Sequence, residues 1–282
     1  MDGRRRPPAQ YEERPCSRAL NPVRGMPFSW SLNPYVGCVH RCTFCYVRAF
    51  EARAERASAD GYGRRIRVKT NLATLLRVEL ARPSWSAQLV AVGTATDPYQ
   101  AAEARYRLTR ACLSELARAR TPAALVTRGP LVIRDLDVLQ ELEARAGVTV
   151  TVSLPTLGRE IWRRTEPGTA PPHQRLRAIS ELVGAGIRAG IALAPLLPGI
   201  SDDPESIAAT VAAAREAGAT FLWWGMLRLP DGTREHFLEA LGREWPELVP
   251  GYLAMYRRGV AAPPSVRGAA QTAVEVARRR WG

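Results

Sequence analysis

The sequence lacks any long uncharged apolar run and has almost no lysine. No stretch of about 18 apolar residues is free of charge, which argues against a transmembrane helix. Met1 is followed by Asp2, Gly3 and three arginines with no apolar segment behind them. The pattern therefore predicts no secretory signal, no membrane contact and a cytoplasmic location.

Cysteine is also scarce, and its number is odd. Five cysteines among 282 residues, without a secretory signal, argue against a disulfide framework and favour reduced thiols kept for metal binding or catalysis. Cys16 lies near the N-terminus and Cys112 lies between alanine and leucine in a predicted helix, so both are interpreted as ordinary residues. The other three cysteines are close together in the sequence.

Apolar side chains make up 46% of the chain, enough for one sizeable core, which excludes disordered and collagen-like classes. Of the formal net charge of +13, residues 1–24 carry +3 (six arginines, three acids) and residues 257–282 carry +5 (six arginines, one acid). We predict a central domain at residues 25–256 with basic extensions at 1–24 and 257–282. Basic tails are usually solvated but can hold phosphates, so a nucleic-acid partner is left open.

Short apolar runs alternate with longer amphipathic stretches. The apolar runs predict strands at residues 32–36, 88–93, 123–127, 148–154, 187–195 and 220–227. The amphipathic stretches predict helices at residues 42–57, 70–81, 101–120, 135–146, 172–185, 204–217 and 234–241. Gly147, Gly186 and Gly218 each follow a helix and precede a strand, where a left-handed residue is needed. The fold class is therefore α/β, a partial (βα)6 TIM-type barrel whose chemistry lies on the loops after the strands.

The loop after the first predicted strand carries three cysteines. Cys38, Cys42 and Cys45 form a C-x3-C-x2-C pattern, and we call residues 37–46 the cysteine loop. Iron–sulfur clusters usually take four thiolates, so three would leave one iron open. A zinc site that adds His40 is the alternative, although this spacing on a single loop is unusual for structural zinc.

The cysteine loop, with Phe44 before its last cysteine and Tyr46 after it, resembles the signature of the radical S-adenosylmethionine (SAM) enzymes. The resemblance implies a [4Fe-4S] cluster on the three cysteines, whose open iron chelates the amino and carboxylate groups of SAM. It further implies reductive cleavage of SAM to methionine and a 5′-deoxyadenosyl radical that abstracts hydrogen from a substrate. An electron donor such as flavodoxin or ferredoxin is implied as the partner.

Within that superfamily, residues 33–199 resemble the spore photoproduct lyase-like group, also called DNA repair photolyase-like. The resemblance rests on Thr-Ala-Thr-Asp at 94–97, Glu-Pro-Gly-Thr-Ala-Pro at 166–171, the later Arg175 and Ala178, and Ala-Pro at 194–195. It implies a set of residues around SAM, with hydroxyls and a guanidinium for its polar groups and apolar or aromatic side chains for its adenine: Phe44, Tyr46, Thr94, Thr96, Arg128, Ser153 and Ala194.

Two of these positions carry a chemical argument. Arg128 offers a bidentate fork for a carboxylate where the lyase group uses a lysine, although an arginine after a strand is often only a surface ion pair. Thr94 stands where the lyase uses a cysteine as hydrogen donor. An O–H bond is far stronger than S–H, so we predict a radical SAM enzyme with a different or broader substrate, a nucleic acid being one option.

Several other residues carry weaker predictions. Glu166 and Arg175 are expected to form a buried ion pair, while Asp97 and Tyr99 are expected at the barrel mouth, where they either meet substrate or, for Asp97, cap a helix. Trp223 and Trp224 must point to opposite faces of a strand, one into the barrel and one onto the helices. The only lysine, Lys69, is predicted to face the cluster or substrate side, with chance survival at the surface as the alternative.

Two other functions stay open at this point. The first is a DNA-binding protein with a structural or sensory iron–sulfur cluster and no SAM chemistry, in which the basic extensions supply affinity. The second is a zinc-binding protein. The open iron that the resemblance implies and the SAM-type residues on the same barrel face favour the enzyme over both.

Overall fold

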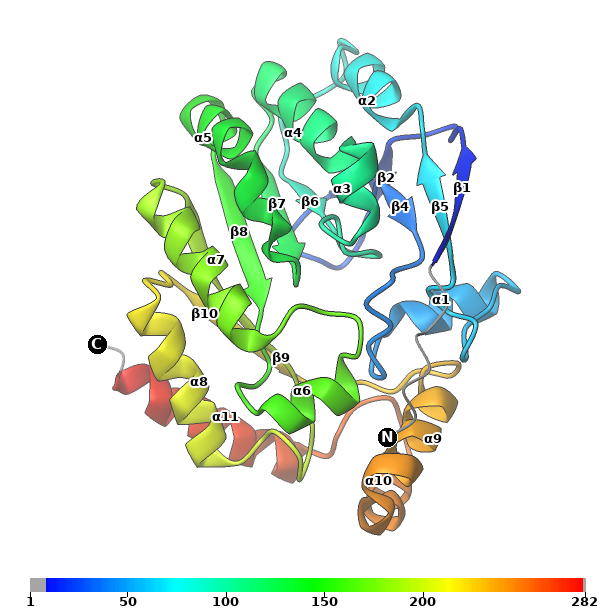
Figure 1. The fold of residues 1–282 in the computed structure, drawn as a ribbon, viewed down its shortest axis with the longest axis vertical. Helices are drawn as coiled ribbons and strands as arrows, with labels where there is room; N and C mark the ends of the chain where they lie inside the picture. Colours follow the sequence, from blue (N-terminus) through cyan, green and yellow to red (C-terminus); the bar gives the residue numbers. More distant parts are fainter. Residues whose placement is uncertain (1–8, 281–282) are drawn as a thin grey trace.

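A seven-stranded sheet forms the centre of the molecule (Figure 1). The computed structural model describes residues 9–280. The sheet order is β10-β9-β8-β7-β6-β3-β2, and all pairs are parallel except β2 with β3. The strands are β2 (Leu20–Pro22), β3 (Trp30–Leu32), β6 (Val90–Val92), β7 (Ala123–Thr127), β8 (Val148–Ser153), β9 (Arg188–Leu196) and β10 (Leu222–Met226). Within the described residues, six parallel strands in one open sheet confirm the predicted partial barrel.

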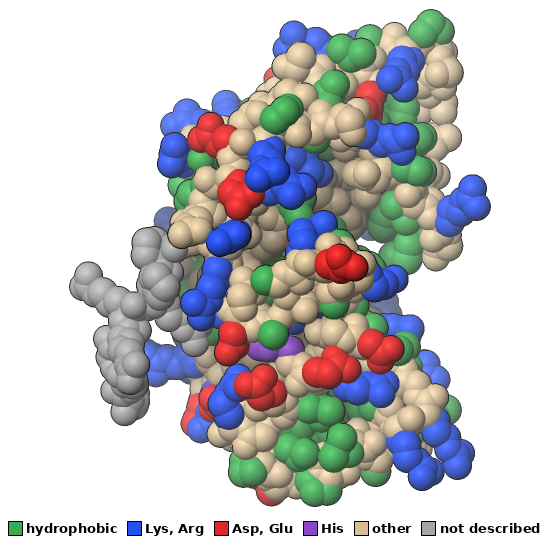
Figure 2. Space-filling model, turned by 90° about the vertical axis from the view of Figure 1, so that its right-hand side faces the viewer, with side chains coloured by type: hydrophobic (Ala, Val, Ile, Leu, Met, Phe, Trp, Pro, Cys, Tyr) green, Lys and Arg blue, Asp and Glu red, His purple; other side chains and the backbone are tan. Residues whose placement is uncertain are grey.

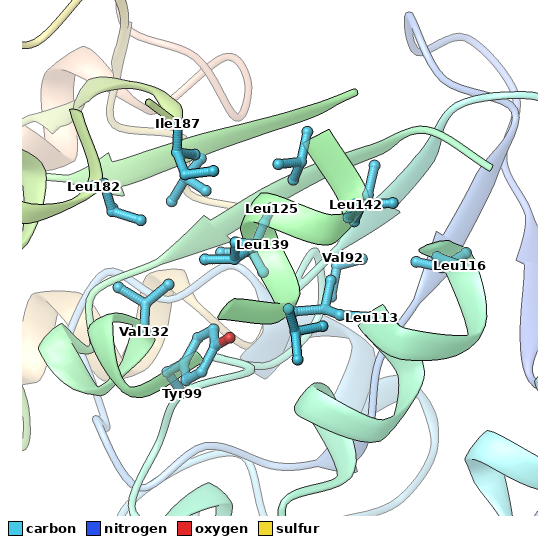
Figure 3. Close-up of a cluster of buried hydrophobic side chains, with 14 of the residues drawn as sticks. Val92, Tyr99, Leu113, Leu116, Leu125, Val132, Leu139, Leu142, Leu182 and Ile187 are labelled. Carbon is cyan, nitrogen blue, oxygen red and sulfur yellow. The ribbon is translucent and has the colours of Figure 1, made fainter. Parts of the chain in front are cut away.

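Helices cover the outer face of this sheet and bury its main core. They are α2 (Leu72–Leu80), α4 (Leu108–Arg118), α5 (Leu136–Arg145), α7 (Pro172–Gly184) and α8 (Pro204–Glu216). Figure 3 shows Leu113 and Leu116 of α4 and Leu139 and Leu142 of α5 pointing at the sheet, where Leu125 of β7 meets them. The alternating valines and threonines of β8 are nearly all buried because both faces of that strand are covered.

The helix ends follow the predicted glycine pattern. Gly147, Gly186 and Gly218 have φ angles of +94°, +81° and +84°, a backbone region that glycine enters without steric cost. The predicted helix at 101–120 is wrong in one respect, because Arg107 takes a left-handed conformation (φ 52°) and divides it into α3 (Ala102–Tyr106) and α4.

The first predicted strand, residues 32–36, is also wrong as a single element. Pro34 has no N–H to donate, and the chain leaves the main sheet there. β4 (Tyr35–Val36) instead pairs with β5 (Arg65–Lys69), which also pairs with β1 (Gln10–Arg14) in a separate three-stranded sheet. β1 and β5 escaped sequence analysis because both are rich in charged residues and lack an apolar run.

The helix predicted at 42–57 is shorter, since α1 runs only over Val47–Arg53 and the cysteines precede it. The short helix α6 (Arg159–Thr165) and the 3-10 turn η1 (Pro130–Asp135) were not predicted. Both follow strand ends, and α6 lies below the arrowhead of β8 in Figure 1. Its sequence carries three arginines and one glutamate in seven residues, which hides any apolar stripe.

The C-terminal part of the chain packs in two places. α9 (Arg234–Glu244), η2 (Pro246–Leu248) and α10 (Val249–Met255) build a cluster with Cys42 and Phe44 of the cysteine loop. α11 (Pro264–Arg279) packs against α8 and β10. The predicted extensions at both ends thus contribute ordered elements, β1 and β2 from one and α11 from the other. None of the helices in residues 9–280 combines the length and the hydropathy that a membrane-spanning segment requires.

The two tryptophans of β10 lie in different environments, and the surface cations are widely distributed. Trp224 packs onto the cluster formed by α8 and α11, and Trp223 is 45% exposed. The side of the molecule in Figure 2 shows cations spread over the whole face rather than gathered in one patch.

Candidate active site

The cysteine loop follows β4 and is tied down by side chains from the loop after β6. The buried Thr96 hydroxyl donates to the carbonyl of Gly37 at 2.6 Å, and the Gln100 amide donates to the same carbonyl at 3.1 Å. Gln100 also accepts from the amide of Val39 at 3.0 Å through its own carbonyl oxygen. One fully buried glutamine therefore fixes the backbone on both sides of Cys38.

The other side of the cysteine loop packs directly against the loop after β8, backbone to backbone. The amide of Gly168 donates to the carbonyl of His40 at 3.0 Å. A Cβ atom at Gly168 would stand 2.3 Å from the Val39 oxygen and 2.9 Å from the His40 Cα. Only glycine lets these two backbones approach so closely.

This close approach predicts a specific effect of Gly168→Ala. The new methyl group must push the cysteine loop away, which should destabilise the fold by about 1–3 kcal/mol and lower the iron content after reconstitution. Gly184→Ala is the matched control, because a Cβ at the end of α7 meets nothing within 4 Å and alanine favours helix. Urea unfolding and iron analysis of the two variants measure the difference. Equal iron content in both would contradict the argument.

Asp97 joins the cysteine loop to the end of β7. It is buried, and its carboxylate accepts from the Thr127 hydroxyl and the Arg128 amide, both at 2.6 Å. His40 Nδ1 lies 3.3 Å from the same carboxylate. Burial alone would raise the pKa of Asp97, but His40, Thr127 and the Arg128 amide lower it to about 2. Asp97 is thus a linker with no free oxygen for a substrate.

A depressed carboxyl pKa makes stability depend on pH. The contribution of Asp97 is present above the unfolded-state pKa of about 3.9 and is lost as the pH falls towards 2. The free energy of unfolding of the metal-free protein should therefore fall by about 2 kcal/mol more between pH 4.5 and 2 than that of Asp97→Asn. Urea titrations at several pH values test this, with Asp231→Asn, at an exposed position, as the control. Parallel pH profiles for the wild type and Asp97→Asn would refute it.

A buried ionic cluster lies behind the loop at residues 166–171. Glu166, 1% exposed, accepts from Arg128 Nε at 2.6 Å, and its other oxygen lies 3.0 Å from Arg175 Nη1. Arg175 also donates to the backbone carbonyls of Ser153 and Ala170, each at 2.9 Å. The predicted ion pair of Glu166 with Arg175 is confirmed. Burial on its own raises the pKa of Glu166, but Arg175 and Arg128 lower it further than burial raises it.

Arg128 is the cation of this group that keeps some exposure. Its side chain is 21% exposed, and its guanidinium carbon lies 5.6 Å from the centre of the Phe44 ring. Arg128 Nη2 also donates to the carbonyl of Ala194 at 3.4 Å. Glu166 therefore positions Arg128 next to the cysteine loop and the end of β9. The remaining N–H groups of the Arg128 guanidinium are available to an anion.

The two aromatic residues of the cysteine loop differ in exposure. Phe44 is 6% exposed and packs with the apolar side chains of α9 and α10, so one of its edges is already used in the core. Tyr46 is 48% exposed, and its hydroxyl donates to the backbone oxygen of Thr94. Of the two aromatic residues, therefore, only Tyr46 has enough exposed surface for another flat ring to stack on it.

Asn33 holds the loop that carries Thr94. Its amide donates to the Thr94 hydroxyl at 3.2 Å and accepts from the Ala95 amide at 2.7 Å. Lys69 donates to the Asn33 carbonyl at 2.8 Å, and the thiols that act on its charge are those of Cys16 and Cys112. Of the prediction that Lys69 faces the cluster or substrate side, the cluster part is wrong, because β5 belongs to the separate sheet and the ammonium lies near Cys16 and Cys112 rather than the cysteine loop. Burial lowers the pKa of its ammonium.

The structure thus brings the predicted residues to one end of the sheet. Some of them are buried with their polar groups already bonded, and others keep exposed surface. Thr96 is buried with its hydroxyl engaged, and Ser153 is 3% exposed with its carbonyl bound by Arg175. Ala194, before a cis peptide bond to Pro195, lies beside Arg128. Their contacts with SAM stay predictions. Sequence analysis missed two supporting residues, Asn33 and Gln100, since polar residues in loops carry no periodic signal.

The donor set on the cysteine loop fits an iron–sulfur cluster. Cys38, Cys42 and Cys45 are free thiols, two of them buried and the third half-buried. Burial raises the pKa of Cys42 and Cys45, so ligation, which needs thiolates, is coupled to the release of protons. Within residues 9–280, no three His, Cys, Asp or Glu side chains stand close enough together to hold a single metal ion.

Comparison with known proteins agrees with this geometry. The sequence profile of the family described as the Radical SAM superfamily matches residues 32–211, more than half of the chain. An uncharacterised protein of Mycobacterium tuberculosis is 38% identical over 260 residues, which cover 91% of this chain and 76% of that protein. An uncharacterised protein of Methanocaldococcus jannaschii is 24% identical over 86% of this chain and 87% of its own length.

Solved structures show the same fold. Spore photoproduct lyase complexed with dinucleoside spore photoproduct superposes with a TM-score of 0.73 at 13% identity, covering 96% of this chain and 79% of the lyase. A lyase mutant with bound AdoMet and the same dinucleoside gives 0.71 at 12% identity, covering 93% of this chain and 76% of that one. SuiB of Streptococcus suis bound to S-adenosylmethionine gives 0.53 at 16% identity, covering 81% and 48%. The profile match, together with the three cysteines at the end of the open sheet, establishes that the chain belongs to the radical SAM superfamily.

Proposed function

We propose that this protein is an enzyme that holds a [4Fe-4S] cluster on Cys38, Cys42 and Cys45, cleaves SAM reductively and abstracts hydrogen from a substrate. The observation that carries the proposal is the cysteine loop itself. Its three free thiols lie on a backbone held by several hydrogen bonds, beside an arginine that is partly exposed and is positioned by Glu166. A cluster with only a structural role would not need that cation. When bound, the cluster and SAM supply one-electron cleavage and an organic radical.

The side chains of this protein would bind and orient the cofactor. Arg128, fixed on one edge by Glu166, offers its remaining N–H groups to the carboxylate of SAM. Tyr46 offers an exposed aromatic face to the adenine, and Ala194 leaves space for that ring. Ser153 supports a polar group of SAM from the end of β8. The packing of α9 and α10 on Phe44 keeps water away from one side of the cysteine loop.

The substrate is proposed to differ from that of spore photoproduct lyase. Thr94 takes the place of the hydrogen-donating cysteine that the resemblance assigns to the lyase, and its hydroxyl is bound by Asn33. A nucleic acid is the proposed substrate class to test first, with an electron-transfer protein such as flavodoxin or ferredoxin as partner. Catalytic reversal of a spore photoproduct lesion in DNA by the purified protein would show that the argument from Thr94 is wrong.

The proposal is tested by anaerobic purification and reconstitution. We expect a brown protein with about four irons, an EPR signal after reduction with dithionite that changes when SAM is added, and release of 5′-deoxyadenosine. A colourless zinc protein would overturn the proposal. A cluster whose EPR signal does not change when SAM is added would instead favour a structural or sensory role.

A further inference from the structure

Tyr62 lies directly behind one of the cluster-binding cysteines and has no role in the proposed function so far. Its phenol oxygen is 3.6 Å from Cys45 Sγ, and its side chain is 1% exposed. The aromatic ring packs in a small apolar cluster with Cys38 and Val47. Within residues 9–280, the sulfur of Cys45 is the one hydrogen-bond partner found for this hydroxyl.

Arg48 holds the ring of Tyr62 from the other side. The guanidinium carbon of Arg48 lies 4.5 Å from the ring centre, and the residue is 1% exposed. Its N–H groups donate to the carbonyls of Ser58 at 2.6 Å and Ala59 at 2.8 Å, just before Tyr62 in the chain. It also donates to the carbonyl of Cys42 at 3.4 Å. Arg48 thus joins the segment that carries Tyr62 to the backbone of the cysteine loop.

The charge of Arg48 is as informative as its contacts. All its hydrogen-bond acceptors among the described residues are neutral backbone carbonyls, and no carboxylate in that part of the chain forms an ion pair with it. A buried cation without an ion-pair partner is costly unless negative groups lie nearby, and among the groups whose charge acts on Arg48 that of Cys45 comes first, ahead of the carboxylate of Asp60. A cluster bound by three thiolates is such a group. The hydrogen bond of Tyr62 and the charge of Arg48 then act on the cluster in the same direction.

We infer that Tyr62, clamped by Arg48, donates a hydrogen bond to the Cys45 sulfur of the bound cluster and raises its reduction potential. The inference rests on the proposed function, because it requires the [4Fe-4S] cluster. With the sulfur bonded to iron, Cys45 has no proton to give, so the phenol is the donor. Reduction adds one electron to the cluster, while the proton stays on the phenol oxygen. Hydrogen bonds to sulfur and burial are among the factors that set cluster potentials.

Tyr62→Phe tests the inference, since it removes the hydroxyl and keeps the ring over Arg48. In an EPR-monitored redox titration without SAM, the ratio of reduced to oxidised cluster at a fixed potential should fall by about fivefold to tenfold, tenfold being 59 mV for one electron. Tyr252→Phe is the matched control, because this equally buried phenol donates to the carbonyl of Pro198 and not to sulfur. Its midpoint should equal that of the wild type.

The outcomes separate the inference from the proposed function. A wild-type protein that takes up no four-iron cluster would contradict both the inference and the proposed function. A wild-type cluster that responds to SAM, with an unchanged midpoint in Tyr62→Phe at full iron content, would overturn the inference alone. If Tyr62→Phe loses its cluster, pulsed ENDOR of the reduced wild-type protein in H2O and D2O decides. The Val47 amide also hydrogen-bonds Cys45 and contributes one exchangeable proton, so a second coupled exchangeable proton supports the phenol donor and its absence contradicts it.

Discussion

Replacing Cys42 with alanine should abolish cluster binding and reduce the formation of 5′-deoxyadenosine to the level of a protein-free control. The reason is the number of donors, because two thiolates cannot hold a cluster whose fourth iron position is already left open. The same result is expected for Cys38→Ala and Cys45→Ala. Iron and sulfide analysis after anaerobic reconstitution, followed by the deoxyadenosine assay, measures the loss.

Cys112→Ala is the control for this prediction. Cys112 belongs to α4 and is fully buried in the main core, which contains no residue of the cysteine loop. Its replacement should cost about 1 kcal/mol of stability through a small cavity and leave the iron content unchanged. A Cys42→Ala protein that keeps four irons would show that the cluster is bound elsewhere.

Glu166→Gln should produce the largest loss of stability of any single conservative change in the site. The substitution keeps the shape of the side chain but leaves Arg175, which is fully buried, and Arg128 without their shared carboxylate. Breaking a buried ion pair from one side costs about 3–5 kcal/mol, which for a chain of this size lowers the melting temperature by roughly 10 °C. The pH profile should follow: this contribution is present above the pKa of an unfolded glutamate and disappears as the pH falls through the lowered pKa of Glu166.

An exposed ion pair supplies the comparison for Glu166. Glu181 pairs with Arg177 on the surface of α7, where the arginine side chain is 75% exposed. Glu181→Gln should change the free energy of unfolding by less than about 1 kcal/mol. Calorimetry and urea unfolding of the two metal-free variants give the contrast. Similar melting temperatures for both would mean that Arg128 and Arg175 find other partners.

The parts of the fold that sequence analysis predicted are those with a periodic or chemical signal. The predicted bounds of β7 are correct to the residue, because its short apolar run lies between Pro122, which cannot donate a backbone N–H, and the charged Arg128. The cysteine spacing and the Glu166–Arg175 pair were identified from residue type and order. These signals are local, so they could be read without knowing the fold.

What could not be predicted depends on contacts between distant segments. Gln100 looks like any polar residue in the sequence, yet its amide binds backbone 61 and 63 residues away. Arg128 was expected to offer its fork to a carboxylate or to form a surface ion pair, and its pairing with the buried Glu166 appears only once β7 and the loop after β8 are side by side. β1 and β5 pair across more than 50 residues with charged sequences that carry no strand pattern.

The ties of the cysteine loop have a consequence for the order of events in biosynthesis. The amide of Thr43 donates to the carbonyl of Thr165 at 2.9 Å, and the carbonyl of His40 is bound by Gly168, more than 120 residues further along the chain. Contacts of such long range form late in folding because a large loop must close first. When the three cysteines have just left the ribosome, the cysteine loop therefore still lacks its hydrogen bonds to Thr165 and Gly168. Cluster insertion into the finished shape has to wait until the segment around Gly168 has been synthesised and has docked.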